Sequence, residues 1–245
     1  GRLIRQVTAK SSAGLHQTSW DLRLPAPEPV SIMSGGSRPY WMRDPVGPLV
    51  LPGKYSARLA IERDGVLTDT GATRSFTVKA LPESGEITTD RQALQIFQLE
   101  VASLQRAVRG SVKAMAELRD RLAHIRATMR VTPAMTAEDR AAVTSLEARL
   151  LDLGVRFNGD RTVSSRNEPA PMGIASRVSS IYGTLVNSQS PVGQNFRGSS
   201  QVATEEFSLA LSELGDLATE IAALEASMER SGAPWTPGRI PAMPQ

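Results

Sequence analysis

The amino-acid sequence predicts an α+β chain in which a small β-sandwich precedes an antiparallel α-helical bundle with long helices. Two observations support this prediction. Up to Pro82, apolar and polar residues alternate, which is the period of a strand. From Thr88 onward, apolar residues recur every three or four positions, which is the period of a helix. The chain therefore divides into a strand-rich module over 1–82, a helical bundle over 83–233 and a proline-rich tail over 234–245.

Short strands and tight turns are predicted in the first module. The segments with strand character are residues 1–7, 15–24, 54–62 and 74–78. Between the last two lies Asp64-Gly65, a dipeptide that is typical of a two-residue hairpin turn. Several short strands joined by such turns are the pattern of an immunoglobulin- or fibronectin-like sandwich.

Residues 25–48 interrupt the strand pattern with nine prolines and glycines, so a long irregular loop is expected there. Tyr40 and Trp41 lie side by side in this loop. They are either an aromatic platform for a sugar or a protein, or side chains that cover the sandwich edge or pack on the helices. His16 has no second histidine near it in the sequence, so we expect a packed or edge residue rather than a ligand or a base.

Four helices are predicted in the second half. A long coiled-coil-like stripe runs from Leu94 to Met129, and Thr132-Pro133 ends it. Thr136 is a good N-cap for a second helix, because Asp139 follows it at capping-box spacing. Two further stripes, over 174–185 and 207–228, predict a third and a fourth helix. Polar loops are expected over 158–170 and 187–199, and packing of the stripes predicts a bundle.

The residue inventory gives no catalytic, cofactor-binding or metal-binding set. The chain has no cysteine and two histidines, His16 and His124, which lie far apart in the sequence. His124 lacks the glutamate three residues upstream that metal-carboxylate bundles use. No phosphate-binding glycine loop, nucleophile elbow or zinc-protease motif is present. We therefore predict no catalytic residue, no cofactor and no metal.

Charge is divided unevenly along the chain. Residues 1–82 carry 11 basic and 6 acidic groups, and residues 83–233 carry 16 basic and 19 acidic groups. Neither half contains a block of like charge, so a nucleic-acid partner is not indicated. The apolar runs are too short to predict a membrane span. Trp235, in the proline-rich tail, is expected to anchor that tail on the bundle and is a further candidate binding residue.

Two parts of the sequence resemble known families. Residues 1–5 (GRLIR), 13–23 (AGLHQTSWDLR) and 47–55 (GPLVLPGKY) resemble the β-sandwich module of flagellar hook-capping proteins. With the helical half and the ending 233–241 (APWTPGRIP), the order is similar to the C-terminal region of secreted bacterial sortilin-like or sialidase-type (BNR) repeat proteins, often labelled glycosyl hydrolases. The resemblance implies a preceding β-propeller domain as a partner and an extracellular or periplasmic location.

These observations favour a non-catalytic accessory region that supports domain packing or assembly of a larger secreted protein, with self-association through the bundle as an option. The alternative is a carbohydrate- or protein-binding module that uses the 25–48 loop. A share in a glycoside hydrolase active site is a weaker alternative, because no acid and base pair can be named. The resemblance transfers no catalytic residue, since the chain contains no Asp-box repeat.

Overall fold

A computed structural model describes residues 1–29, 44–81, 90–237, 240 and 243. It is a mixed α+β structure: a two-stranded antiparallel sheet is followed by helices, which make up more than half of the described residues. The last strand ends at Val78 and the first helix begins at Arg91, which confirms the predicted change of period. A β-sandwich is not shown, because the described residues form one sheet of two strands.

Strands β1 (Gly53–Arg63) and β2 (Val66–Val78) form the predicted hairpin. Asp64 and Gly65 make its turn with φ values of 51° and 75°, so both central residues have the positive φ of a type I′ turn. An irregularity between Arg58 and Ala60 shifts the register. β2 continues through this point, so the separate strand expected over 74–78 is the end of one longer strand.

The strands expected over residues 1–7 and 15–24 are wrong for the described structure. In this region the backbone makes one isolated bridge, between Arg23 and Leu49, supported by the Leu24 N–H donating to the Pro48 carbonyl at 2.9 Å. The side chain of Leu15 is completely exposed. Alternation predicts a strand when one face is buried, but apolar side chains such as Leu3 and Leu15 stay exposed here.

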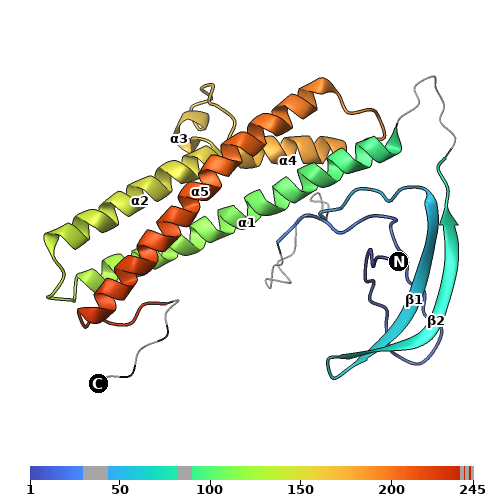
Figure 1. Cartoon of the computed structure of the whole chain (residues 1–245), viewed down its shortest axis with the longest axis horizontal. Coiled ribbons are helices and arrows are strands. Elements are labelled where there is room, and N and C mark those ends of the chain that lie inside the picture. Colours follow the sequence, from blue (N-terminus) through green and yellow to red (C-terminus); the bar gives the residue numbers. More distant parts are fainter. Residues whose placement is uncertain (30–43, 82–89, 238–239, 241–242, 244–245) are drawn as a thin grey trace.

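Helices α1 (Arg91–Met129), α2 (Ala137–Asn158), α4 (Ile174–Leu185) and α5 (Gln194–Arg230) form the bundle. The two long helices, α1 and α5, run in the same direction. The shorter α2 and α4 follow one another in the opposite direction and together span about the same length (Figure 1). The bundle therefore has three parallel or antiparallel columns: α1, α5, and a third column in which α4 follows α2.

The helix ends confirm several sequence predictions and correct one. Thr136 and Asp139 form the predicted capping box at the start of α2. Asp90 caps α1 by accepting from the backbone N–H groups of Gln92 and Ala93, both at 3.0 Å. α5 begins at Gln194, so the loop expected over 187–199 is shorter. In the first turns of α5, Phe196 is the large side chain that packs against the core. One such residue gives no repeating apolar pattern from which a helix could be predicted.

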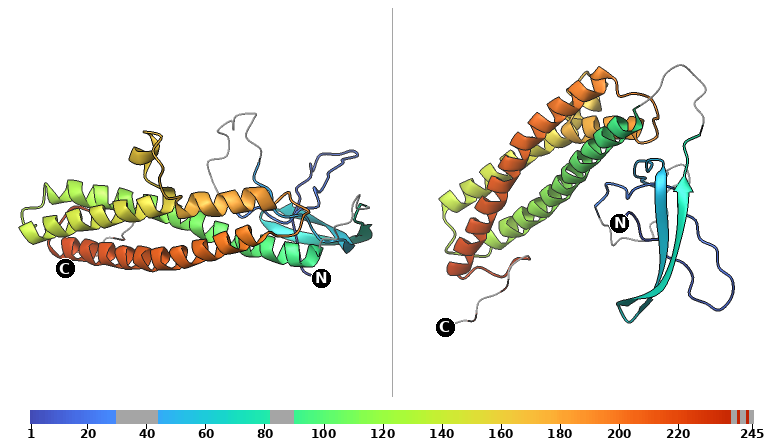
Figure 2. Two further views of the ribbon diagram at one scale, coloured as in Figure 1. Left: turned by 90° about the horizontal axis from the view of Figure 1, so that it is seen from above. Right: turned by 45° about the vertical axis from the view of Figure 1, so that its right-hand side comes forward.

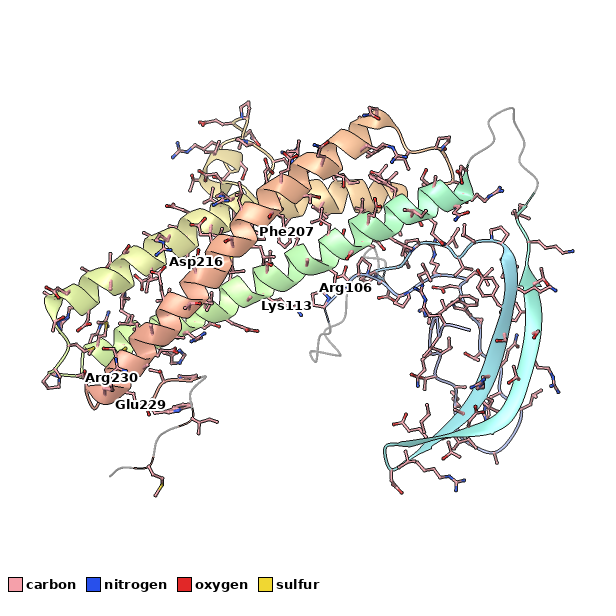
Figure 3. All side chains as sticks on the ribbon, viewed as in Figure 1. Arg106, Lys113, Phe207, Asp216, Glu229 and Arg230 are labelled. Atoms are coloured by element: carbon pink, nitrogen blue, oxygen red, sulfur yellow. The ribbon has the colours of Figure 1, made fainter. Side chains whose placement is uncertain are left out.

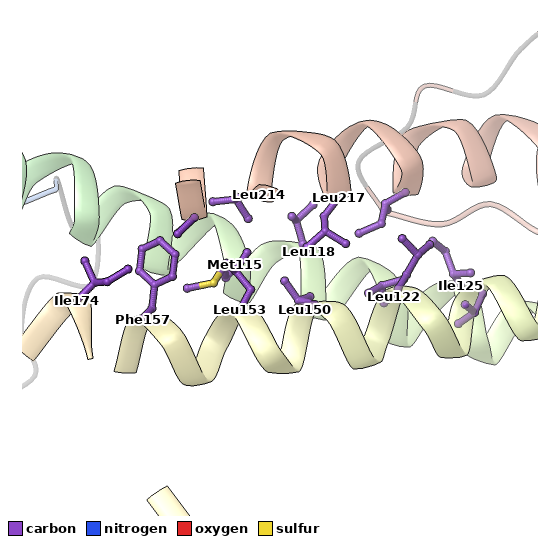
Figure 4. Packing of buried hydrophobic residues seen from close by; sticks show 14 of the residues in the cluster. Met115, Leu118, Leu122, Ile125, Leu150, Leu153, Phe157, Ile174, Leu214 and Leu217 are labelled. Carbon is purple, nitrogen blue, oxygen red and sulfur yellow. The ribbon is translucent and has the colours of Figure 1, made fainter. Parts of the chain in front are cut away.

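The main core lies between α1, α2 and α5 and is built from aliphatic side chains. Figure 4 shows Leu118 and Leu122 from α1 packing against Leu150 and Leu153 from α2 and Leu217 from α5. Two aromatic rings extend this core towards α4, because Phe157 and Phe207 meet edge-to-face with centroids 6.0 Å apart. The predicted stripes of the helices are thus confirmed as core for most of their length, but Leu211, which belongs to the predicted stripe of the fourth helix, is 46% exposed.

Between α2 and α4 the chain leaves the bundle and returns (Figure 2). This excursion contains the one-turn helix α3 (Arg161–Ser164), where the sequence predicted a polar loop. Its two ends meet at Gly159 and Gly173. A Cβ atom on Gly173 would lie 2.4 Å from the Gly159 nitrogen, so glycine is required for this approach.

Within the described ranges, no helix combines the length and the apolar character needed to cross a membrane.

Candidate functional site

The three aromatic residues singled out in the sequence have different outcomes. Tyr40 and Trp41 lie outside the described residues, so their role as a binding platform stays a prediction. Trp235 lies on the tail beyond α5 and is about half exposed. Thr236 is buried and Ala233 packs against the core. The tail thus contacts the body of the protein through Ala233 and Thr236, while the side chain of Trp235 is only partly buried.

The base of the hairpin carries an aromatic cluster of Trp20, Tyr55 and Phe76. The Trp20 ring lies 5.8 Å from Tyr55 and 6.3 Å from Phe76, both edge-on, and the Tyr55 and Phe76 rings stack at 6.0 Å. The indole N–H of Trp20 donates to the Arg23 carbonyl at 3.0 Å. One half of the apolar hairpin face is therefore covered by the N-terminal segment.

The other half of this face is uncovered. Alternate residues of a strand share a face, so Leu59 and Ile61 follow Tyr55 on the same side of β1. Val66 lies on this side too, because it pairs with Arg63. The exposed fractions are 58% for Leu59, 47% for Ile61 and 64% for Val66. The distal half of the hairpin thus presents aliphatic side chains to solvent, on a two-stranded sheet that is marginally stable by itself.

Two arginines border this uncovered apolar face. Arg63 occupies the same side of β1, and Arg74 pairs with Ala57 on that side of the ladder. Arg58, on the opposite side, forms an exposed ion pair with Asp69 at 3.2 Å. We call Leu59, Ile61, Val66, Arg63 and Arg74 together the hairpin patch.

A second group of residues joins the N-terminal segment to the bundle. Arg23 donates to the Gly47 carbonyl at 2.9 Å and, across the junction, to the Val186 carbonyl at 3.3 Å and to the Asn187 side-chain oxygen at 2.9 Å. A Cβ atom on Gly47 would lie 2.0 Å from the Leu24 carbonyl oxygen, which makes glycine necessary where the two segments cross.

Glutamines on α1 complete the junction. Gln95 donates to the Leu49 carbonyl at 2.7 Å, and the buried Gln98 donates to the Leu185 carbonyl at 2.6 Å. The sequence reasoning missed these residues because they lie outside the apolar stripe. A pattern in the sequence could have indicated them: polar residues recur at steps of three to seven along the same helix and continue to Gln105 and Arg109.

Tyr182 is the most perturbed titratable side chain of the junction. Its hydroxyl donates to the Val46 carbonyl at 2.7 Å. Burial, and after it the charge of Glu28, raises the pKa of Tyr182 to about 12, although the charges of nearby arginines oppose this rise. Glu28 is itself paired with Arg109. One of these arginines, Arg106, lies on the side of α1 that faces the N-terminal segment (Figure 3).

The raised pKa of Tyr182 predicts an alkaline loss of stability. Because the folded pKa lies above the ordinary value of 10.0, the contribution is complete below pH 10 and disappears as the pH rises through about 12. We expect Tyr182→Phe to cost about 1 kcal/mol below pH 10, and this difference to shrink at higher pH. Tyrosinate absorbance checks the assignment: the wild type should show a late step that the variant lacks. A Tyr182 that titrates together with the other tyrosines would contradict the burial argument.

The geometry offers no acid and base pair and no metal cluster in the part of the chain that is described. No group of three or more possible ligands gathers there. His16 is an exposed loop residue rather than a packed one, and its Nε2 lies 2.7 Å from the Ser12 carbonyl oxygen. His124 is also exposed, with its Nδ1 2.8 Å from the Asp120 carbonyl oxygen. Open hollows of about 420 and 320 Å³ lie along the N-terminal segment beside Arg5 and Gln6.

Comparison with known proteins adds no assignment, since no protein-family model, curated protein or solved structure matches the chain. The function of this chain is therefore inferred from the geometry of the described residues.

Proposed function

We propose that this chain is a non-catalytic structural module of a larger protein, in which the bundle is a stiff spacer and the hairpin patch is a contact surface. The uncovered apolar face of the hairpin is the observation that carries this proposal. Monomeric proteins normally cover such aliphatic rows, and contiguous exposed ones are typical of interaction sites. The second layer of the predicted β-sandwich would then come from a partner.

The construction of the bundle supports the spacer role. Its interior is a continuous aliphatic core, and its surface ion pairs join neighbouring helices, as in the pairs of Arg149 with Glu220 at 2.7 Å and Arg156 with Glu213 at 2.5 Å. A helix of 39 residues such as α1 is about 60 Å long at ~1.5 Å per residue. The junction with the N-terminal segment fixes the hairpin at one end of this rod.

Hydrogen exchange over β1 and β2 tests the proposal. A two-stranded hairpin with an open face opens readily, so its amides should exchange quickly in the dilute chain. In the complete, assembled protein they should exchange more slowly, because a partner covers the patch. Equal rates in the two states would contradict the proposed contact.

A further inference from the structure

Helix α5 is unusually acidic. Between Arg197 and Arg230 this helix contains seven carboxylates and no basic residue. Some of these carboxylates bind arginines of the neighbouring helices, namely Glu206 with Arg177, Glu213 with Arg156, Glu220 with Arg149 and Glu225 with Arg121. Neither Glu205 nor Asp216 forms an ion pair with another described residue, although the nearby charge of Asp216 helps to raise the pKa of Arg149.

Glu205 and Asp216 belong to a stripe that also carries apolar side chains. The stripe consists of Val202, Glu205, Leu209, Ser212 and Asp216, at steps of three and four residues along one side of α5. All five are exposed, with Val202 at 41% and Leu209 at 70%. The core residues of α5 lie on its other side. We call these five residues the α5 stripe; Figure 3 labels Asp216 within it.

The hairpin patch and the α5 stripe complement each other in chemistry and in spacing. Both combine exposed aliphatic side chains with two charges, which are positive on the hairpin and negative on the helix. On α5, Leu209 lies between the two carboxylates and Val202 lies before them. Arg74 pairs with Ala57, six residues before Arg63 on β1, which corresponds to about 20 Å at ~3.3 Å per residue. Glu205 and Asp216 are eleven residues apart, which corresponds to about 16 Å along a helix.

We propose that the hairpin patch of one copy of this chain docks onto the α5 stripe of a second copy. This inference rests on the proposed function and names the partner of the same surface. Contact between two hairpin patches would bring four arginines together, and contact between two α5 stripes would bring four carboxylates together. Like-with-like pairing is therefore repelled, and hairpin-to-helix pairing is attracted.

The arrangement of the chain makes this contact intermolecular. The hairpin lies beside the first turns of α1, away from the middle of α5, in the views of Figures 1 and 2. α5 also lies on the side of the bundle opposite the α3 excursion, so that excursion leaves the stripe uncovered (Figure 2). A contact between two different surfaces is head-to-tail, and each docked copy still offers one free patch and one free stripe.

The test measures association of the full chain by sedimentation velocity over a range of concentrations at low and high salt. The wild type should associate beyond a dimer and should do so less at high salt, because the contact is partly electrostatic. Ile61→Asp removes the patch, and Leu209→Arg removes the stripe. Each variant alone should associate at least about tenfold more weakly, which is ~1.4 kcal/mol. The matched control Leu151→Arg, on the exposed side of α2, should behave like the wild type.

Mixing the two variants gives the decisive result. One variant keeps an intact stripe and the other keeps an intact patch, so the mixture should form a one-to-one dimer that grows no further. A wild type that stays monomeric up to about 1 mM, or a mixture that stays monomeric, would overturn the inference. Melting temperatures of the separate variants establish that each is folded.

Failure of this inference is distinguishable from failure of the proposed function. If the chain does not self-associate but the hairpin is protected in the complete protein, the partner is a different surface and the inference is wrong. If the hairpin is equally unprotected in both states, the proposed function itself is wrong.

Discussion

Leu153→Ala should destabilise the bundle by about 2–5 kcal/mol. The Leu153 side chain is completely buried in the core between α1, α2 and α5, where it lies near Met115 and Leu214 (Figure 4). Truncation to alanine removes the transfer free energy of the buried methyl groups and leaves a cavity that rigid helices fill only in part. Denaturant unfolding followed by circular dichroism measures the loss as a lower midpoint.

Leu151→Ala is the matched control for this measurement. It is the same substitution two residues earlier on α2, but the Leu151 side chain is 62% exposed. We expect a change within about 0.5 kcal/mol. Equal effects at the two positions would mean that the rotation of α2 about its axis is not the one described.

Arg121→Met should cost on the order of 3 kcal/mol, because it removes the arginine that pairs with a buried carboxylate. Arg121 donates to both oxygens of Glu225, at 3.1 and 2.6 Å, and the Glu225 side chain is 4% exposed. Methionine keeps the aliphatic packing of the arginine stem, so the loss reports mainly on the charge. Thermal or denaturant unfolding near neutral pH gives the value.

Arg149→Met provides the comparison for the buried pair. Arg149 donates one hydrogen bond to Glu220, at 2.7 Å, and this carboxylate is 48% exposed. Its loss should cost less than about 1 kcal/mol, since solvent can replace the arginine. The pKa of Glu220 is lowered by its hydrogen bond to Arg149, so this small contribution should fade further in acid. A larger effect at Arg149 than at Arg121 would contradict the assigned burial.

The helical half could be predicted closely from the sequence. Stripes such as Leu118, Leu122 and Ile125 identify a helix because each position buries the same side, and this rule depends on local spacing alone. The capping box at Thr136 is equally local. The same dependence on buried positions explains why the start of α5 at Gln194 was not predicted. Its first turns bury few side chains, so the sequence shows little periodicity there.

The strand half was predicted less well, because strand formation depends on distant partners. Residues 15–24 alternate like a strand, but among the described residues they pair only through the bridge at Arg23, whereas the Asp64-Gly65 hairpin carries its own partner. The candidate site also depends on contacts between distant parts of the chain, so it was not predicted. Neither the hairpin patch nor the junction of Arg23 with α4 could be read from spacing, since both depend on which apolar or polar residues remain uncovered after folding.

Hydrogen exchange at Leu59 and Ile61 tests most directly whether the apolar face of the hairpin is a contact surface. The amides of β1 are compared between the dilute chain and the complete, assembled protein, with the buried middle of α1 near Leu122 as the internal standard. We expect exchange in β1 to become slower on assembly by about tenfold or more, while exchange in α1 stays unchanged. Exchange in β1 that is as fast after assembly as before would contradict the proposed contact.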